Sequence, residues 1–179
     1  MDACESQQLP ASIVVVISNK ADAFGLTRAR NHTVPAVHLG LLPGEPRRAY
    51  DLRLAAQVQV FQPDYVILAG WMRLLTSSFL DQFPNRVINL HPALPGMFPG
   101  THAIQRAYAA CQNGEITHSG VMVHLVPDEG VDTGPVLATW KVYFRPDETL
   151  AEFETRIHSA EHFLLVQALK QQIISKNNG

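Results

Sequence analysis

The chain has 179 residues, which is enough for one domain with a buried core. Apolar residues make up 46% and charged residues 17%, a composition that excludes an intrinsically disordered protein. The formal net charge is −2 and no basic run stands out, which argues against nucleic acid as the main partner. A small phosphorylated substrate remains compatible with this charge, because it needs only a local positive site.

The sequence also indicates a cytoplasmic protein with no membrane partner. The two cysteines, Cys4 and Cys111, form no C-x-x-C pair, so no disulfide framework is expected. Apolar stretches are all shorter than the roughly 18–20 residues that cross a bilayer. The first six residues have neither the basic nor the apolar region of a secretory signal.

Strand-like and helix-like segments alternate in the first half. β-Branched residues favour a buried strand over 12–18, and Pro35 favours an edge strand over 34–39. In chain order we expect strand 12–18, helix 21–30, strand 34–39, helix 47–61, strand 65–69 and strand 87–90. Strands separated by helices favour parallel pairing with right-handed crossovers.

The second half follows a different pattern. After a loop over 92–100 we expect a helix near 103–111, then strands over 121–126 and 136–142 with an irregular Asp/Gly/Pro-rich link between them. The final helix has the clearest start, because Thr149 and Glu152 form a capping-box pattern ahead of apolar residues at helical spacing. Together the segments predict one α/β domain over residues 1–179.

Two strand ends carry candidate functional side chains. Ligands of open parallel sheets bind beyond the carboxyl ends of the strands. Segment 68–75 leaves a strand through Gly70 and is expected to expose large apolar side chains in a loop. The next strand ends with Asn89 and His91, whose i, i+2 spacing places them on the same side of an extended chain. A histidine beside an amide donor suits a reaction that builds negative charge on oxygen while a proton moves.

A third candidate, Asp132, lies in the acid- and glycine-rich link 128–135. A carboxylate close to an imidazole holds the ring in one orientation and raises its pKa. Asn89, His91 and Asp132 are therefore a candidate oxyanion donor, general acid and tuner of that acid.

Each candidate also has an ordinary structural interpretation. Asn89 and His91 are compatible with a turn hydrogen bond beside a structural histidine, Asp132 with a turn, and Trp71 and Met72 with the core. Four histidines are candidate metal ligands: His91, His102, His118 and His124. Their spacing matches no metal-ligand signature, so no metal site is expected.

Four segments, in this order and at similar separations, resemble the phosphoribosylglycinamide formyltransferase family. They are residues 17–26, 68–75, 88–94 and 123–135, and the similarity covers almost the whole chain. The resemblance implies a doubly wound, mostly parallel sheet with helices on both faces. It also implies a reaction of purine biosynthesis, in which the amine of phosphoribosylglycinamide attacks the formyl carbon of 10-formyltetrahydrofolate.

The resemblance assigns roles to individual residues. Asn89 and protonated His91 would stabilise the oxyanion, and Asp132 would keep His91 charged and relay a proton through water to the departing folate nitrogen. Glu161, with its neighbour His158, would contact the glycinamide substrate. The implied folate-binding residues are Arg47 at the acidic tail, Met72, Arg73, Leu74, Leu75, Asn89, Asp128, Glu129, Val131 and Asp132. The implied partners are small molecules, and we expect a monomer or a weak homodimer.

The sequence departs from the family at its start. The family begins with an extra strand and a Gly-x-Gly-Ser-Asn loop that binds the substrate phosphate through backbone N–H groups. Residues 1–4 resemble the helix that follows, so we expect the first strand and the Gly-rich loop to be missing and phosphate binding to be weakened. Two alternatives stay open: a formyltetrahydrofolate deformylase, which passes the formyl group to water, and a truncated, non-catalytic folate-binding remnant.

Overall fold

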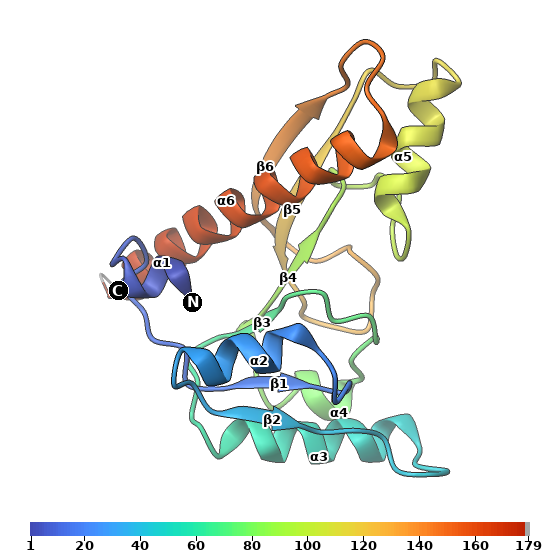
Figure 1. Cartoon of the computed structure of the whole chain (residues 1–179). Helices are drawn as coiled ribbons and strands as arrows, with labels where there is room; N and C mark the ends of the chain where they lie inside the picture. The colour runs from blue at the N-terminus through green and yellow to red at the C-terminus, as the bar shows by residue number, and fades with distance from the viewer. Residues whose placement is uncertain (178–179) are drawn as a thin grey trace. The chain divides into compact units, whose positions relative to one another are not determined.

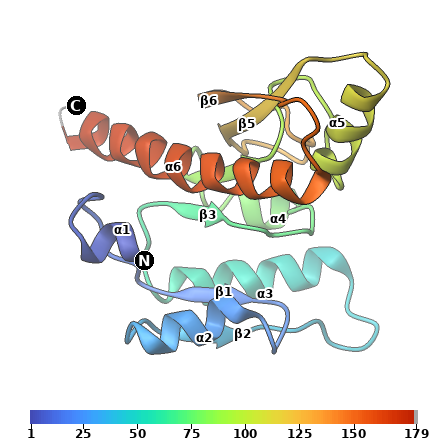
Figure 2. The same ribbon diagram turned by 45° about the horizontal axis from the view of Figure 1, so that its top comes forward.

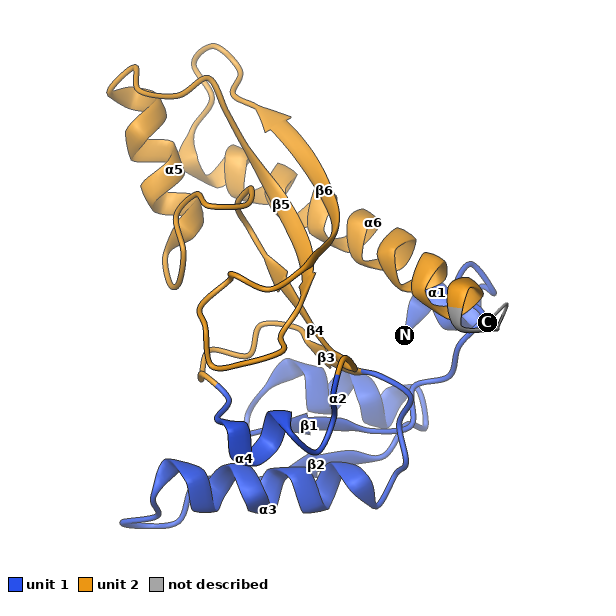
Figure 3. Ribbon diagram, turned by 180° about the vertical axis from the view of Figure 1, so that it is seen from behind, with its two compact units in different colours: residues 1–65, 75–84 blue, residues 66–74, 85–179 orange. Residues whose placement is uncertain are grey.

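The computed structural model describes residues 1–177 and separates them into two compact units (Figures 1 and 3). Unit 1 comprises residues 1–65 and 75–84, and unit 2 comprises residues 66–74 and the chain from Asn85 onward. The prediction of a single domain over residues 1–179 stays a prediction, and each unit is described by itself.

Unit 1 contains a small parallel sheet and four helices. Its elements are α1 (Asp2–Glu5), β1 (Val16–Ser18), α2 (Phe24–Asn31), β2 (Ala36–His38), α3 (Arg47–Gln59) and α4 (Ser77–Leu80). Strands β1 and β2 pair in parallel through the crossover helix α2, as the alternation of segments predicts. Helix α3 packs against α4, and the buried Asp51 carboxylate accepts a hydrogen bond from the Thr76 N–H at 2.7 Å.

Unit 2 is built on a four-stranded mixed sheet. Its elements are β3 (Val66–Leu68), β4 (Val87–His91), α5 (Ala103–Gln112), β5 (His118–Leu125), β6 (Val136–Tyr143) and α6 (Leu150–Asn177). The strand order is β3-β4-β5-β6, with β3 and β4 parallel and the other two pairings antiparallel. The α/β class is confirmed. The pairing of β5 with β6 is antiparallel because these two strands are joined by a loop with no crossover helix.

Helix α6 covers β5 and β6 (Figure 2). Its buried face includes Phe153, Ile157 and Leu164, which recur at helical spacing. The predicted capping box is confirmed: the Thr149 N–H donates to Glu152 Oε2 at 2.8 Å, and the Glu152 N–H donates to Thr149 Oγ1 at 3.3 Å. Over residues 1–177, no helix combines the length and apolar character needed to cross a membrane.

Candidate active site

Strand β4 presents Asn89 and His91 on the same side, as their spacing predicts, and both meet Asp132. The Asn89 Nδ2–H group donates to Asp132 Oδ1 at 3.1 Å, and His91 Nδ1 lies 3.3 Å from Asp132 Oδ2. The side chain of His91 is 5% exposed and that of Asp132 is 10% exposed. The structure therefore brings the three residues into one shielded cluster within unit 2.

The loop between β5 and β6 holds the carboxylate in place. Asp132 has a φ of +55°, in the left-handed region, and its Oδ2 accepts a hydrogen bond from the Gly100 N–H at 2.8 Å. Gly134 is required by close packing, because a Cβ there would overlap the main-chain carbonyl oxygen of Leu125. The Gly130 N–H donates to Asp128 Oδ1 at 2.8 Å and closes the turn at the tip of the loop. The glycines of this segment thus shape a loop that aims Asp132 at β4.

A fourth residue, His124 of β5, belongs to the same cluster. Its side chain is 2% exposed, and its Nε2 lies 3.1 Å from Asn89 Nδ2 and 3.4 Å from Asp132 Oδ1. The sequence offered His124 only as a potential metal ligand. The missed signal was the register of the sheet, in which Asn89 and His124 are direct cross-strand partners. Over residues 1–177, the structure contains no group of three His, Cys, Asp or Glu side chains arranged to hold a metal ion.

The environment of His91 corrects one expectation. Burial lowers the pKa of His91 below its usual value of 6.5, although the Asp132 carboxylate and the Phe98 carbonyl both act in the opposite direction. Asp132 acts in the expected direction, but the pKa of His91 is lowered overall because the cost of burying the charged ring exceeds this attraction. His91 Nε2 donates to the Phe98 carbonyl at 3.2 Å while Nδ1 faces Asp132, so both ring nitrogens have acceptors beside them. The ring therefore lies in a buried setting that lowers its pKa but provides an acceptor beside each nitrogen.

Asp132 is held in its ionised form. Burial raises its pKa, but this effect is outweighed by the adjacent His124 ring, the Gly100 N–H and the adjacent His91 ring, which all lower it. The pKa of Asp132 consequently lies below its usual 3.8, and the group is a carboxylate at neutral pH.

A cavity of about 310 Å³ opens beside this cluster. His91 and Asp132 line it together with Leu94, Met97, Met122 and Val131, so two titratable groups face an otherwise largely apolar space. That combination, and a volume at the lower end for small-molecule sites, fits the reacting end of an organic ligand.

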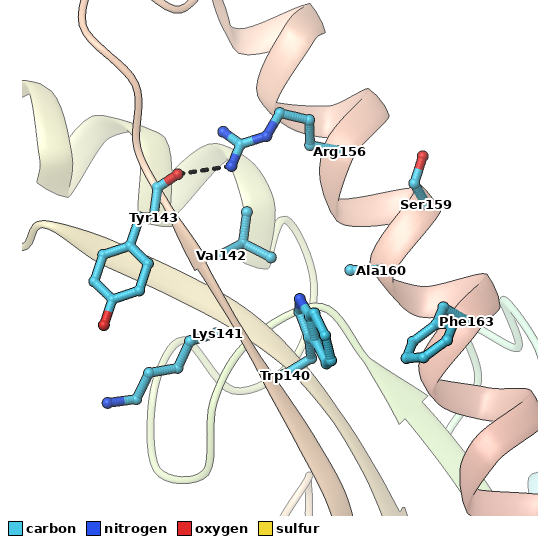
Figure 4. Close-up of a pocket in the computed structure, with 8 residues that line it drawn as sticks. All are labelled: Trp140, Lys141, Val142, Tyr143, Arg156, Ser159, Ala160 and Phe163. Atoms are coloured by element: carbon cyan, nitrogen blue, oxygen red, sulfur yellow. Dashed lines mark hydrogen bonds between the residues drawn. The ribbon is translucent and has the colours of Figure 1, made fainter.

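A second cavity, of about 410 Å³, lies between β6 and α6 and contains none of the predicted site residues (Figure 4). The rings of Trp140 and Phe163 meet edge-to-face across it, with their centroids 5.3 Å apart. At one end Arg156 donates to the Tyr143 carbonyl at 2.9 Å.

The remaining predicted residues lie on both units. In unit 2, the Met72 and Leu74 side chains are 72% and 48% exposed, which agrees with an apolar loop surface. His158 and Glu161 form an i, i+3 pair on α6, with Nδ1 and Oε2 2.7 Å apart. Of the other predicted site residues in unit 2, Arg73 and Val131 are half-buried and Asp128 and Glu129 are exposed. Unit 1 holds the exposed Arg47, at the start of α3, and the buried Leu75.

Comparison with known proteins identifies the family of the chain. The formyl transferase family model matches residues 1–169. The chain belongs to the formyl transferase family. Within the family it is similar to the phosphoribosylglycinamide formyltransferase of Dictyostelium discoideum, with 41% identity over 95% of this chain and 88% of that protein. The Escherichia coli K12 phosphoribosylglycinamide formyltransferase is 36% identical over 90% of this chain and 74% of that protein.

Solved structures place the fold in the same family. The crystal structure of phosphoribosylglycinamide formyltransferase from Bacillus halodurans superposes with a TM-score of 0.89 at 32% identity, covering 96% of this chain and 86% of that one. Glycinamide ribonucleotide transformylase 1 from Symbiobacterium toebii gives a TM-score of 0.87 at 37% identity, covering 94% and 77%. The chain is thus a member of the phosphoribosylglycinamide formyltransferase group.

Proposed function

We propose that this chain transfers the formyl group of 10-formyltetrahydrofolate to the amine of phosphoribosylglycinamide, a step of purine biosynthesis. The observation that carries the proposal is the buried contact of Asn89 and His91 with the Asp132 carboxylate, beside a largely apolar cavity, in a member of this family. Such a centre combines a donor for developing oxyanion charge with a group that exchanges protons.

The reaction needs one bond made, one broken and one proton moved. The amine nitrogen bonds to the formyl carbon, the bond from that carbon to the folate nitrogen breaks, and a proton passes from the amine to the folate nitrogen. Negative charge on the formyl oxygen during attack raises the pKa of the adjacent His91. We assign His91 as the group that takes up a proton at this stage, with Asp132 stabilising the resulting imidazolium and helping to relay the proton through water.

Asn89 is assigned as the second oxyanion donor. One of its amide hydrogens is directed at Asp132 Oδ1 at 3.1 Å, and a formyl oxygen entering the cluster competes for this hydrogen. Removing one such donor or acid–base group typically lowers the rate by roughly 10²–10⁴-fold.

Folate binding is assigned to the apolar loop and to the β5–β6 link. Met72 and Leu74 expose the apolar surface that a flat ring system requires, and Val131 lines the cavity next to Asp132. Arg73, Leu75, Asp128 and Glu129 complete this proposed set. Arg47 is proposed to bind the acidic tail of the folate, and His158 and Glu161 to contact the glycinamide substrate.

Formate release separates the transferase from the deformylase. The purified chain is incubated with 10-formyltetrahydrofolate, with and without phosphoribosylglycinamide, and formate and deformylated folate are quantified. If the chain is a transferase, deformylated folate forms only when the amine is present, and no equivalent amount of formate is released. Formate production at the same rate without the amine contradicts the proposal and favours the deformylase.

A calorimetric titration with a folate analogue addresses the non-catalytic alternative. Binding without turnover at saturating amine indicates a folate-binding remnant. Binding accompanied by amine-dependent turnover supports the enzyme.

A further inference from the structure

His124 lies beside two of the three side chains that the proposed reaction uses, Asn89 and Asp132. It lies on β5 directly opposite Asn89 on β4, and its Nε2 is within 3.4 Å of both Asn89 Nδ2 and Asp132 Oδ1. The register between β5 and β6 shifts at Val123 and His124, which marks a bulge at this point of the sheet. Bulges next to a functional site re-aim the local side chains.

The hydrogen bonds of His124 define its tautomer. Nδ1 lies 2.8 Å from the Leu125 carbonyl oxygen, which only accepts, so Nδ1 carries the hydrogen. In the neutral ring Nε2 then has a free lone pair and accepts a hydrogen bond from Asn89 Nδ2. This arrangement determines which end of the Asn89 amide faces β5: the nitrogen rather than the oxygen.

The two amide hydrogens of Asn89 therefore have different partners. One is held by His124 Nε2, and the other is directed at Asp132 Oδ1. Only the second hydrogen is then available for exchange with an incoming oxyanion. The second hydrogen of Asn89 in turn holds Asp132 Oδ1, while His91 and the Gly100 N–H lie beside Oδ2.

We propose that His124 is a positioning residue of the centre: it fixes the orientation of the Asn89 amide, so that the second amide hydrogen is directed at Asp132 Oδ1. The kinetic part of this inference rests on the proposed formyl transfer, whereas the geometric part does not. A purely structural buried histidine predicts a loss of stability alone. A positioning role predicts a loss in kcat at nearly constant KM, with recovery when an acceptor is restored.

The test compares His124→Leu, which removes the acceptor, with His124→Gln, whose amide oxygen can replace Nε2. Val121→Ala is the matched control, since Val121 is a fully buried residue of the same strand and lies outside the cluster. Urea denaturation establishes that each variant is folded at the assay temperature. The Asn89 side-chain amide and the His91 ring nitrogens are followed by ¹⁵N NMR, and kcat and KM are measured for formyl transfer.

We expect His124→Leu to shift the Asn89 amide signals and to lower kcat by roughly 10–100-fold, the cost of a small misplacement of reacting groups. His124→Gln should return the amide signals towards wild type and recover most of kcat, and Val121→Ala should leave both unchanged. If His124→Leu does not fold, His124→Asn takes its place, because its shorter side chain withdraws the acceptor from Asn89 while staying polar. If both His124 variants show the same Asn89 signals and the same kcat as Val121→Ala, the inference is wrong.

The NMR measurement distinguishes a failure of the proposed function from a failure of the positioning role. A wild-type chain without formyl transfer contradicts the proposed function, yet the Asn89 signals still report whether His124 orients the amide. Unchanged Asn89 signals in an active enzyme contradict the positioning role alone.

Discussion

Replacing Asp132 with asparagine removes one negative charge while keeping the shape of the side chain. In the structure this charge lies beside His91 Nδ1, at 3.3 Å, on a carboxylate that is 10% exposed. Asparagine tolerates the left-handed φ of +55° at this position, so the backbone need not move. The substitution therefore tests the charge of Asp132 rather than the loop that carries it.

The magnitude follows from the distance. Two unit charges 3.3 Å apart attract by about 5 kcal/mol at an effective dielectric constant of about 20. Only protonated His91 benefits from this attraction, so Asp132→Asn lowers the pKa of His91 further and removes the support for the imidazolium. A fall in kcat of about 10²–10⁴-fold corresponds to about 2.7–5.4 kcal/mol, which is roughly half to all of the Coulomb attraction.

Two measurements check this prediction. The His91 ring is titrated by NMR in the wild type and in Asp132→Asn, and kcat is measured for formyl transfer at pH 7. Asp147→Asn is the matched control, because Asp147 has the same φ of +55° but is an exposed residue outside the cluster. A kcat within threefold of the control, or a His91 pKa that is unchanged or higher, refutes the electrostatic role of Asp132.

Three further predictions concern stability. Burial lowers the pKa of His91 in the folded state, so the unfolded chain takes up the proton first as the pH falls through about 6.5. Below this pH, His91 therefore lowers the free energy of unfolding by at most about 1.4 kcal/mol per pH unit. Urea denaturation between pH 7.5 and 5.5 should show a shallower loss for His91→Gln than for wild type, and equal slopes would contradict the sign. Gly134→Ala should cost roughly 1–3 kcal/mol in urea denaturation, because its Cβ overlaps the Leu125 carbonyl, and wild-type stability would show that the loop relaxes freely. Thr149→Ala should cost about 1 kcal/mol through loss of the cap shared with Glu152, with kcat unchanged; an altered kcat would show that the cap affects the site.

Local signals in the sequence predicted local features of the structure. The Thr149 and Glu152 pattern predicted the start of α6, and the spacing of Asn89 and His91 predicted their common side on β4. Both features are determined by residues within one helical turn or one strand, so the local sequence is sufficient to predict them. Helix α4 was missed because its four residues are too few to show helical periodicity.

Features that depend on distant residues were harder to predict. The place of His124 in the cluster follows from the pairing of β4 with β5, which joins residues 35 positions apart. Asp132 alone was compatible with an ordinary turn, and the family resemblance was needed to connect it with His91. The effect of Asp132 on the His91 pKa was predicted in the right direction, but the larger opposing effect of burial was missed, because the sequence shows the neighbouring charge and not the extent of burial. The antiparallel pairing of β4 with β5 was likewise not predicted, because helix α5 lies between these strands in the chain and the local pattern does not show their relative direction.

Transfer of an isotopic label tests the proposed function most directly. The chain is incubated with phosphoribosylglycinamide and 10-formyltetrahydrofolate carrying ¹³C in the formyl group, and the products are followed by ¹³C NMR. We predict that the label appears on the glycinamide nitrogen, at a rate that His91→Ala lowers by roughly 10²–10⁴-fold. Label that appears only as formate, or that reaches the amine equally fast with His91→Ala, would contradict formyl transfer by this centre.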